Sequence, residues 1–281
     1  MGKKVFIFGC SYSAQQHSVQ RSWGQILQDD YGYEVSNYAI GGSGTDFATW
    51  KLFECISQNS ISPEDIVIFQ TSSFGRMNLQ YQIYEKPATA VKYINEPETW
   101  STDTDFVWFY ENSDHIKWYL ANRCWDLELV RHIAFLQLVK AWALANPEIL
   151  VIALQLDVLH HNQNIGSLAL STPKPFSENN FLIPDIGLYP ISIMESGLTY
   201  EQFTEFTNWD IRLNHLSLPN RLKLAEVLDQ AIKTRDVSQI TYDCFHKNII
   251  GCIKNSEDLK KYVDQGALED HVVSPDLWKK L

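Results

Sequence analysis

Ser11 is the residue of this sequence best placed for nucleophilic chemistry. It lies in the segment 9–13, Gly-Cys-Ser-Tyr-Ser, directly after the apolar run 5–8, which predicts a strand buried on both faces. A serine at the point where such a strand turns into a helix projects its hydroxyl at the carboxyl edge of the sheet. Open α/β folds place their sites at that edge, and the backbone N–H groups that follow can stabilise an oxyanion. The alternative is that Ser11 and Ser13 merely cap the next helix.

A glycine-rich segment follows the second predicted strand. Residues 37–44 read Asn-Tyr-Ala-Ile-Gly-Gly-Ser-Gly, and glycine permits positive φ and close approach of the backbone to a bound group. Similar loops bind dinucleotides, which is the alternative interpretation. The Gly-x-Gly-x-x-Gly spacing is absent, and the segment follows the second strand rather than the first. These two facts disfavour nucleotide binding.

A serine nucleophile needs a general base, and His215 is the candidate. It lies in the segment 210–217, Asp-Ile-Arg-Leu-Asn-His-Leu-Ser, just before a predicted amphipathic helix. A carboxylate would orient the imidazole and stabilise its cationic form, and Asp210 is the near candidate. The alternative is a polar loop that leads into a capped helix. The pairing of an early serine after a strand with a late histidine before a helix favours a Ser–His site.

Two further groups of residues could carry chemistry. His160 and His161 follow the fourth predicted strand, but adjacent histidines point in different directions and Asp157 is the only carboxylate nearby, so we expect no metal site. Aromatic residues in the stretch 77–125 are interpreted mainly as packing onto the sheet, with one or two facing a substrate. They include Tyr81, Tyr84, Tyr93, Trp100, Trp108, Tyr110, Trp118 and Tyr119.

The elements that would position these residues alternate between strand and helix. Continuous apolar runs predict buried strands, and apolar residues at helical spacing predict helices. The prediction is strands at 5–8, 34–40, 65–70 and 149–156, with helices at 21–31, 47–56 and 123–146. Strands joined in this way by helices imply right-handed crossovers and a doubly wound sheet.

The later part of the chain is less regular. A short edge strand is predicted near Leu188 to Met194, and a helix is predicted from Ser217, its N-cap, to about Lys233, with Pro219 in the first turn. We expect one domain at residues 1–235, with an insertion at 77–122. We expect residues 236–281 to form a C-terminal extension, with a helix near 256–263, packed on the same domain.

Composition excludes several classes of protein. The chain has 281 residues, 45% hydrophobic and 20% charged, which is a globular profile. A net charge of −11 disfavours binding to nucleic acid or to anionic lipid. Apolar runs are too short for a membrane span, and the N-terminus does not read as a secretory signal. The five cysteines are widely spaced and form no CxxC pair. We therefore expect a reduced, cytoplasmic chain.

From about residue 3 to residue 233 the sequence resembles the SGNH (GDSL-like) hydrolases. Gly-Cys-Ser at 9–11 is similar to the Gly-Asp-Ser block of that family, with cysteine in place of aspartate. The segment 37–42 is similar to the second block, and the resemblance implies that Gly42 donates to the oxyanion. His-Leu-Ser at 215–217, followed by a helix, is similar to the final block.

Two positions depart from the family pattern. The third block normally presents Gly-x-Asn-Asp after the third strand, but residues 70–78 contain no such motif. Candidate replacements for its oxyanion donor are Ser72, Ser73, Arg76 and Asn78. Loss of one such donor typically costs ~10²–10³ in rate. The family carboxylate lies three residues before the histidine, where this chain has arginine, whereas Asp210 lies five residues before it. A bulge would bring Asp210 to the imidazole; otherwise the site would work as a dyad.

The sequence therefore predicts a three-layer α/β/α fold with a mostly parallel sheet of four or five strands. The resemblance implies the flavodoxin-like strand order 2-1-3-4-5. The predicted function is a serine esterase for small acyl esters, with O-acetyl groups on carbohydrate among the candidate substrates, and it requires no cofactor. Two alternatives stay open: a non-catalytic binding or structural protein on the same fold, and an acyltransferase that uses the same residues.

Overall fold

The structure is a computed structural model, and it describes eight parts of the chain. These are residues 3–14, 21–40, 43–72, 81–83, 86–88, 125–156, 176–196 and 216–247. They contain the predicted sheet, most of the predicted helices and the turn that carries Ser11. Among these residues, no helix combines the length and the apolar character needed to cross a bilayer.

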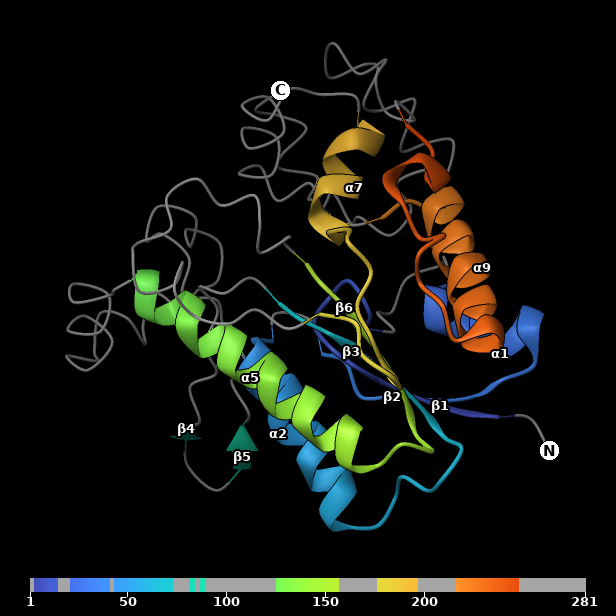
Figure 1. Cartoon of the computed structure of the whole chain (residues 1–281). Helices are drawn as coiled ribbons and strands as arrows, with labels where there is room; N and C mark the ends of the chain where they lie inside the picture. Colours follow the sequence, from blue (N-terminus) through green and yellow to red (C-terminus); the bar gives the residue numbers. More distant parts are fainter. Residues whose placement is uncertain are drawn as a thin grey trace, which may run out of the picture.

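Five parallel strands form the central sheet (Figure 1). The strands are β1 (Lys4–Phe8), β2 (Glu34–Asn37), β3 (Ile66–Gln70), β6 (Leu150–Leu154) and β7 (Phe181–Leu182). Their order is β2-β1-β3-β6-β7, and each neighbouring pair is parallel. Numbered within the sheet, this is the predicted order 2-1-3-4-5, so the predicted fold class is confirmed.

Helices cover both faces of the sheet (Figure 1). On one side lie α1 (Trp23–Tyr31) and α9 (Leu218–Thr234); on the other lie α2 (Thr45–Ser57) and α5 (Trp125–Ala145). The strands and helices predicted between residues 5 and 156 agree with the observed ones to within three residues at their ends. The result is a three-layer α/β/α arrangement.

Alternate residues of each inner strand divide between two hydrophobic cores. In β1, Val5 and Ile7 pack in the core under α1 and α9, whereas Phe6 and Phe8 pack in the core under α2 and α5. All four side chains are fully buried. A parallel strand covered on both faces has no solvated side, which is why its sequence reads as a continuous apolar run instead of an alternating one.

The predicted edge strand near Leu188 to Met194 is wrong. These residues belong to helix α7 (Leu188–Ser196), and the edge strand is β7. Leu188, Ile191 and Ser192 are buried on one side of α7, at helical spacing. Pro190 lies in the first turn, where backbone N–H groups have no partner within the helix and the missing N–H of proline costs nothing.

Two short strands occur inside the predicted insertion. Strands β4 (Tyr81–Ile83) and β5 (Lys86–Ala88) pair antiparallel and form a separate two-stranded sheet. The other predicted features of residues 77–122, and the predicted helix near 256–263, lie outside the described residues. Of the predicted extension, residues 236–247 are described, and they include the short 3-10 helix η2 (Tyr242–Cys244). Val237, Ile240 and Phe245 are buried in the same core as α9.

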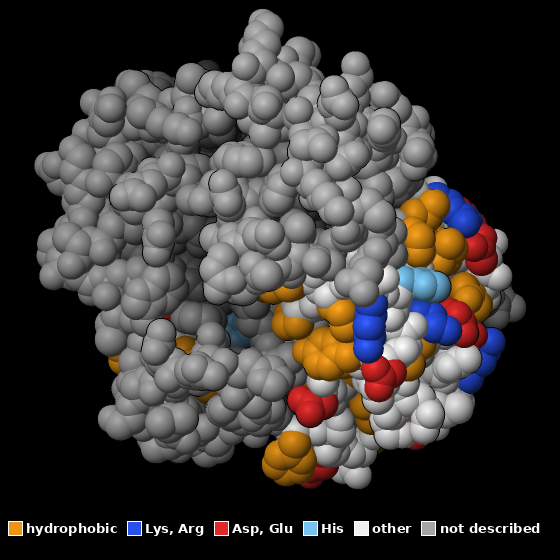
Figure 2. Space-filling model, turned by 90° about the horizontal axis from the view of Figure 1, so that it is seen from above, with side chains coloured by type: hydrophobic (Ala, Val, Ile, Leu, Met, Phe, Trp, Pro, Cys, Tyr) orange, Lys and Arg blue, Asp and Glu red, His pale blue; other side chains and the backbone are white. Residues whose placement is uncertain are grey.

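The described surface carries both signs of charge. Figure 2 shows, on the described part of the face seen from above, lysine or arginine side chains beside aspartate or glutamate side chains, with hydrophobic groups between them. The described part of this face therefore shows no single acidic patch, although the chain has a net charge of −11.

Candidate active site

Ser11 lies in a tight turn that follows β1, at the carboxyl edge of the sheet. The backbone N–H groups of Ser13 and Ala14 both donate to the carbonyl of Cys10, each at 2.9 Å. The Ser11 side chain is buried, with 7% of the residue exposed, and its Oγ has no hydrogen-bond partner among the described residues. Buried hydroxyls nearly always have a partner, so an unpartnered one needs an explanation. A hydroxyl kept for reaction with a ligand is one such explanation.

Gln70, the last residue of β3, holds this turn from the neighbouring strand. Its Oε1 accepts hydrogen bonds from the Cys10 N–H at 3.0 Å and from Ser13 Oγ at 3.1 Å. Its Nε2 donates to the carbonyl of Thr71 and lies 3.3 Å from Cys10 Sγ. Gly9 makes this approach possible, because a Cβ at that position would lie 2.6 Å from Gln70 Oε1.

The turn is also tied to β2 and α1. Asn37 Nδ2 donates to the carbonyl of Ser13 at 2.7 Å, and the indole N–H of Trp23 donates to the carbonyl of Tyr12 at 2.9 Å. Asn37 Oδ1 accepts from the N–H of Ala39 at 3.0 Å. The turn is therefore held from three elements, which leaves Ser11 in a preorganised backbone.

The glycine-rich segment runs alongside the same turn. The carbonyl of Gly9 accepts from the N–H of Ile40 at 3.1 Å and from Ser43 Oγ at 2.8 Å. Gly42, the predicted oxyanion donor, lies outside the described residues. Ile40 and Ser43, on either side of it in the chain, are therefore both hydrogen-bonded to Gly9, which lies two residues before Ser11. The role of Gly42 itself stays a prediction.

The segment after β3 is described as far as Ser72, which is buried. The N–H of Ser72 donates to Thr45 Oγ1 at 2.9 Å, at the start of α2, so this N–H is committed to a protein acceptor. The predicted role of the Ser72 hydroxyl stays a prediction. Ser73, Arg76 and Asn78 lie outside the described residues.

A buried histidine that the sequence analysis missed contacts Thr45, the residue that accepts the Ser72 N–H. His132 Nδ1, on α5, lies 3.2 Å from Thr45 Oγ1. Complete burial, with a smaller contribution from Arg131, lowers the pKa of His132 to about 4. The ring is therefore neutral at pH 7. Thr45 Oγ1 also accepts from the Ser72 N–H, so this hydroxyl at the start of α2 contacts both Ser72 and His132.

His215 and Asp210 lie outside the described residues, and the description resumes at Leu216. Ser217 is the N-cap of α9 and Pro219 lies in its first turn, as predicted.

A second buried group missed by the sequence analysis meets the start of α9. Glu195, in the last turn of α7, is 1% exposed and accepts from the Ser217 N–H at 2.8 Å and from Asn220 Nδ2 at 2.6 Å. Burial raises the pKa of Glu195 to about 7, although the hydrogen bonds from Ser217 and Asn220 oppose that rise. A single charged residue in the otherwise uncharged stretch 188–196 is the sequence signal for such a group.

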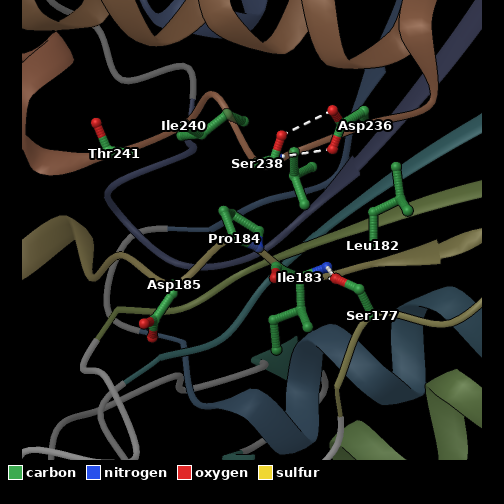
Figure 3. A pocket seen from close by; sticks show the side chains of 10 residues that line it. Ser177, Leu182, Ile183, Pro184, Asp185, Asp236, Ser238, Ile240 and Thr241 are labelled. Carbon is green, nitrogen blue, oxygen red and sulfur yellow. Dashed lines mark hydrogen bonds between the residues drawn. The ribbon is translucent and has the colours of Figure 1, made fainter.

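A cavity of about 410 Å³ lies elsewhere, between the end of β7 and the segment that follows α9 (Figure 3). Figure 3 shows Ser238 hydrogen-bonded to Asp236, and Ser177 paired with the backbone of Ile183. The lining residues are Ser177, Leu182, Ile183, Pro184, Asp185, Asp236, Val237, Ser238, Ile240 and Thr241. This lining holds no histidine or cysteine, so it does not offer the chemistry predicted for Ser11.

Comparison with known proteins gives a solved structure of low similarity. No model of a protein family matches the chain, and no curated protein matches it in sequence. Among solved structures, the chain is similar to the protein YxiM from Bacillus subtilis, with 13% identity and a TM-score of 0.28. The match covers 95% of this chain and 57% of that one, so this chain spans little more than half the length of YxiM.

Proposed function

We propose that this protein is a serine hydrolase that cleaves small acyl esters, with Ser11 as the nucleophile and His215 as the general base. The observation that carries the proposal is the state of Ser11: its hydroxyl is buried and has no partner among the described residues. It lies at the carboxyl end of β1, in a turn fixed by Gln70, Asn37 and Trp23. A preorganised turn lowers the cost of bringing the nucleophile to the substrate.

The proposed reaction has two steps. His215 takes the proton of Ser11 as Oγ attacks the ester carbonyl carbon, and the tetrahedral oxyanion is stabilised by the N–H groups of Ser11 and Gly42. As the oxyanion collapses, the bond to the leaving oxygen breaks and His215 returns the proton to that oxygen. Water, deprotonated by His215, then attacks the acyl-enzyme and releases the acid and Ser11. Asp210 would orient the imidazole, and Ser72, Ser73, Arg76 and Asn78 are the candidates for a third oxyanion donor.

Cys10 is the other side chain of this turn whose type could serve as a nucleophile. Its thiol is fully buried, and its Sγ lies 3.3 Å from the amide nitrogen of Gln70, inside the hydrogen-bonded turn. Reactive cysteines are at least partly exposed. The environment of Cys10 therefore supports a structural role and leaves Ser11 as the nucleophile of this turn.

A fluorophosphonate probe and a short-chain p-nitrophenyl ester test the proposal. We expect the wild type to be labelled and to hydrolyse the ester, and Ser11→Ala to lose labelling and at least ~10³-fold of the rate. The matched control is Ser57→Ala, because Ser57 is exposed at the far end of α2 and should retain both properties. If the wild type is not labelled and turns over no faster than Ser11→Ala, the esterase assignment is wrong.

A further inference from the structure

We infer that Gln155 determines substrate specificity at the Ser11 site: its carboxamide binds a hydroxyl group in the alcohol part of the ester. The inference rests on the proposed function, because it names a substrate contact of that same site. It stands on described residues at the carboxyl ends of β1, β3 and β6, which are neighbours in the sheet.

Gln155 directly follows β6 and has a buried carboxamide without a partner. Only 5% of the residue is exposed, and its Oε1 accepts no hydrogen bond from any described residue. A buried acceptor without a partner costs free energy, so native proteins seldom keep one for the fold alone. Ser11 Oγ, at the same edge of the sheet, is a second such atom. A ligand that contacts both atoms would remove both costs.

The backbone around Gln155 is fixed from two sides. Thr71, directly after β3, donates its N–H to the carbonyl of Leu154 at 2.9 Å, and its Oγ1 accepts from the N–H of Leu156 at 3.1 Å. On the other side, the carbonyl of Gln155 accepts from the N–H of Leu188, at the start of α7, at 3.0 Å. The backbone is thus held in place while the side chain keeps its hydrogen-bonding capacity for a ligand.

The end of β3 connects Gln155 to the Ser11 turn. Gln70, the last residue of β3, accepts from the N–H of Cys10 at 3.0 Å, one residue before Ser11. Thr71, the next residue, binds both chain neighbours of Gln155. Consecutive residues at the end of one strand therefore hold the turn of the nucleophile on one side and Gln155 on the other.

The spacing of the strands sets the size of a ligand that can contact both groups. Phe8 of β1 pairs with Phe69, and Phe69 pairs with Ala153 of β6, so Phe8 and Ala153 lie at one level of the sheet. Ser11 follows the first of these residues closely, and Gln155 follows the second. Because β3 separates β1 from β6 and neighbouring strands are ~4.8 Å apart, the two chains leave the sheet about 10 Å apart. The glutamine side chain covers part of this distance, and an ester of monosaccharide size spans the rest.

Gln155 lies on the side of the sheet that α2 and α5 cover. Ala153 and Val151, two and four residues before it, pack in the core under those helices. Side chains alternate along a strand, so Gln155 shares their side. On this side, the N–H of the buried residue Ser72 donates to Oγ1 of the buried residue Thr45 at 2.9 Å. Buried polar residues therefore lie along the carboxyl edge here, which suits a hydroxylated ligand better than an alkyl chain.

A hydroxyl group matches the carboxamide of Gln155. The carboxamide accepts at Oε1 and donates at Nε2, and a hydroxyl both donates and accepts. An alkyl group in its place would leave the buried carboxamide without a partner, and this cost gives the site its preference for a hydroxylated substrate. Because the proposed substrates carry a small acyl group, the hydroxyl belongs to the alcohol part of the ester.

Two acetate esters of similar shape test the contact in the full-length chain. One is glucose acetylated at its primary hydroxyl; the other is cyclohexylmethyl acetate, which has a ring of the same size but no hydroxyl. We expect the wild type to prefer the glucose ester in kcat/KM. Gln155→Met should lower this preference ~10-fold, because methionine keeps the length of the side chain but loses its hydrogen bonds. Gln28→Met, the same change at an exposed position of α1, is the matched control and should keep the wild-type preference.

Urea unfolding distinguishes a ligand contact from a structural role. Because the carboxamide has no partner in the described fold, Gln155→Met should be at least as stable as the wild type. A strongly destabilised or unfolded Gln155→Met would show that the carboxamide supports the fold, and this result would overturn the inference.

Binding to Ser11→Ala separates the two proposals. This variant keeps Gln155 but lacks the nucleophile, so calorimetry reports binding of the glucose ester without turnover. Suppose that the wild type is unlabelled and inactive, but Ser11→Ala binds the ester and Ser11→Ala/Gln155→Met binds it ~10-fold more weakly. The contact of Gln155 then stands and the proposed function fails.

The opposite result overturns only the role of Gln155. If the wild type hydrolyses both esters and Gln155→Met shows the same preference between them, the proposed function stands and the contact of Gln155 does not. An inactive wild type together with no binding of the glucose ester by Ser11→Ala overturns both proposals.

Discussion

The side-chain oxygen of Gln70 accepts a hydrogen bond from the backbone N–H of Cys10 at 3.0 Å, one residue before Ser11. The two residues are 60 positions apart in the sequence and lie at the same ends of the adjacent parallel strands β1 and β3. The turn that presents Ser11 is therefore fixed by the end of the neighbouring strand as well as by its own residues.

Replacement of Gln70 by leucine should loosen the Ser11 turn. The variant keeps the volume but leaves the Cys10 N–H and the Ser13 hydroxyl without their buried acceptor, which costs about 1–3 kcal/mol in the free energy of unfolding. Esterase kcat should fall in parallel, because the nucleophile loses its fixed backbone. Urea unfolding and ester turnover check the two effects. Gln28→Leu, the same change at an exposed position of α1, should be nearly neutral in both assays, and equal effects at the two positions would contradict the assigned role of Gln70.

Gly9 and Gly32 should respond differently to alanine. At Gly9 the new Cβ would lie 2.6 Å from Gln70 Oε1, so the turn must shift, and we expect about 1–3 kcal/mol of destabilisation together with lost turnover. At Gly32, the C-cap of α1, the φ of 76° is strained for alanine but no atom lies within 4 Å of the new Cβ. Gly32→Ala should therefore cost about 1 kcal/mol and leave turnover unchanged. Thermal unfolding and ester assays on both variants distinguish steric displacement of the site from simple backbone strain.

The sheet and its covering helices could be predicted from local sequence. The apolar runs at 5–8 and 65–70 are bounded by residues that end strands, and inner parallel strands have no polar face to hide the pattern. The stretch 188–196 is ambiguous in sequence, because a short apolar segment fits both a strand and a buried helix. Its buried residues, Leu188, Ile191 and Ser192, follow the helical period. The isolated bridge between Gly187 and Gln155 places the start of this helix at the edge of the sheet.

The site could be predicted only in part, for a physical reason. The position of Ser11 after β1 follows from chain order alone. The contacts of His132 and Glu195 join residues 87 and 22 positions apart, and no local pattern indicates which partner a buried polar side chain will meet. Such contacts depend on how the helices pack, since tertiary position, and not periodicity, decides which polar groups face one another.

Burial of His132 should make the protein less stable in mild acid. Its pKa is lowered to about 4 from the usual 6.5, chiefly by burial, so the unfolded chain binds the extra proton between these values. Stability is then fully present above about pH 6.5 and is lost as the pH falls toward 4, by at most about 3 kcal/mol. Urea unfolding from pH 4 to 7.5 should show this loss in the wild type relative to His132→Leu. If the difference between the two proteins does not change with pH, His132 is not the titrating group.

Glu195 should act in the opposite direction over an overlapping range. Burial raises its pKa to about 7 from 4.5, so the folded chain holds the proton more tightly than the unfolded chain. This contribution is fully present below pH 4.5 and is lost as the pH rises toward 7. The wild type should therefore lose stability relative to Glu195→Gln between pH 4.5 and 7, and the difference should level off above that range. A difference that grows with pH would mean that the hydrogen bonds from Ser217 and Asn220 outweigh burial.

Ser11 and Ser13 offer the sharpest contrast between function and stability, because both are buried serines of one turn. The Ser11 hydroxyl has no partner among the described residues, whereas Ser13 Oγ donates to Gln70 at 3.1 Å. Burial of an unpartnered hydroxyl costs free energy, so Ser11→Ala should leave stability unchanged or raise it by up to about 1 kcal/mol while abolishing turnover. Ser13→Ala should lower stability by about 1 kcal/mol and still be labelled by the fluorophosphonate at Ser11. Urea unfolding and labelling of both variants check this. A strong loss of stability in Ser11→Ala would show that its hydroxyl serves the fold and would remove the main support for its role as the nucleophile.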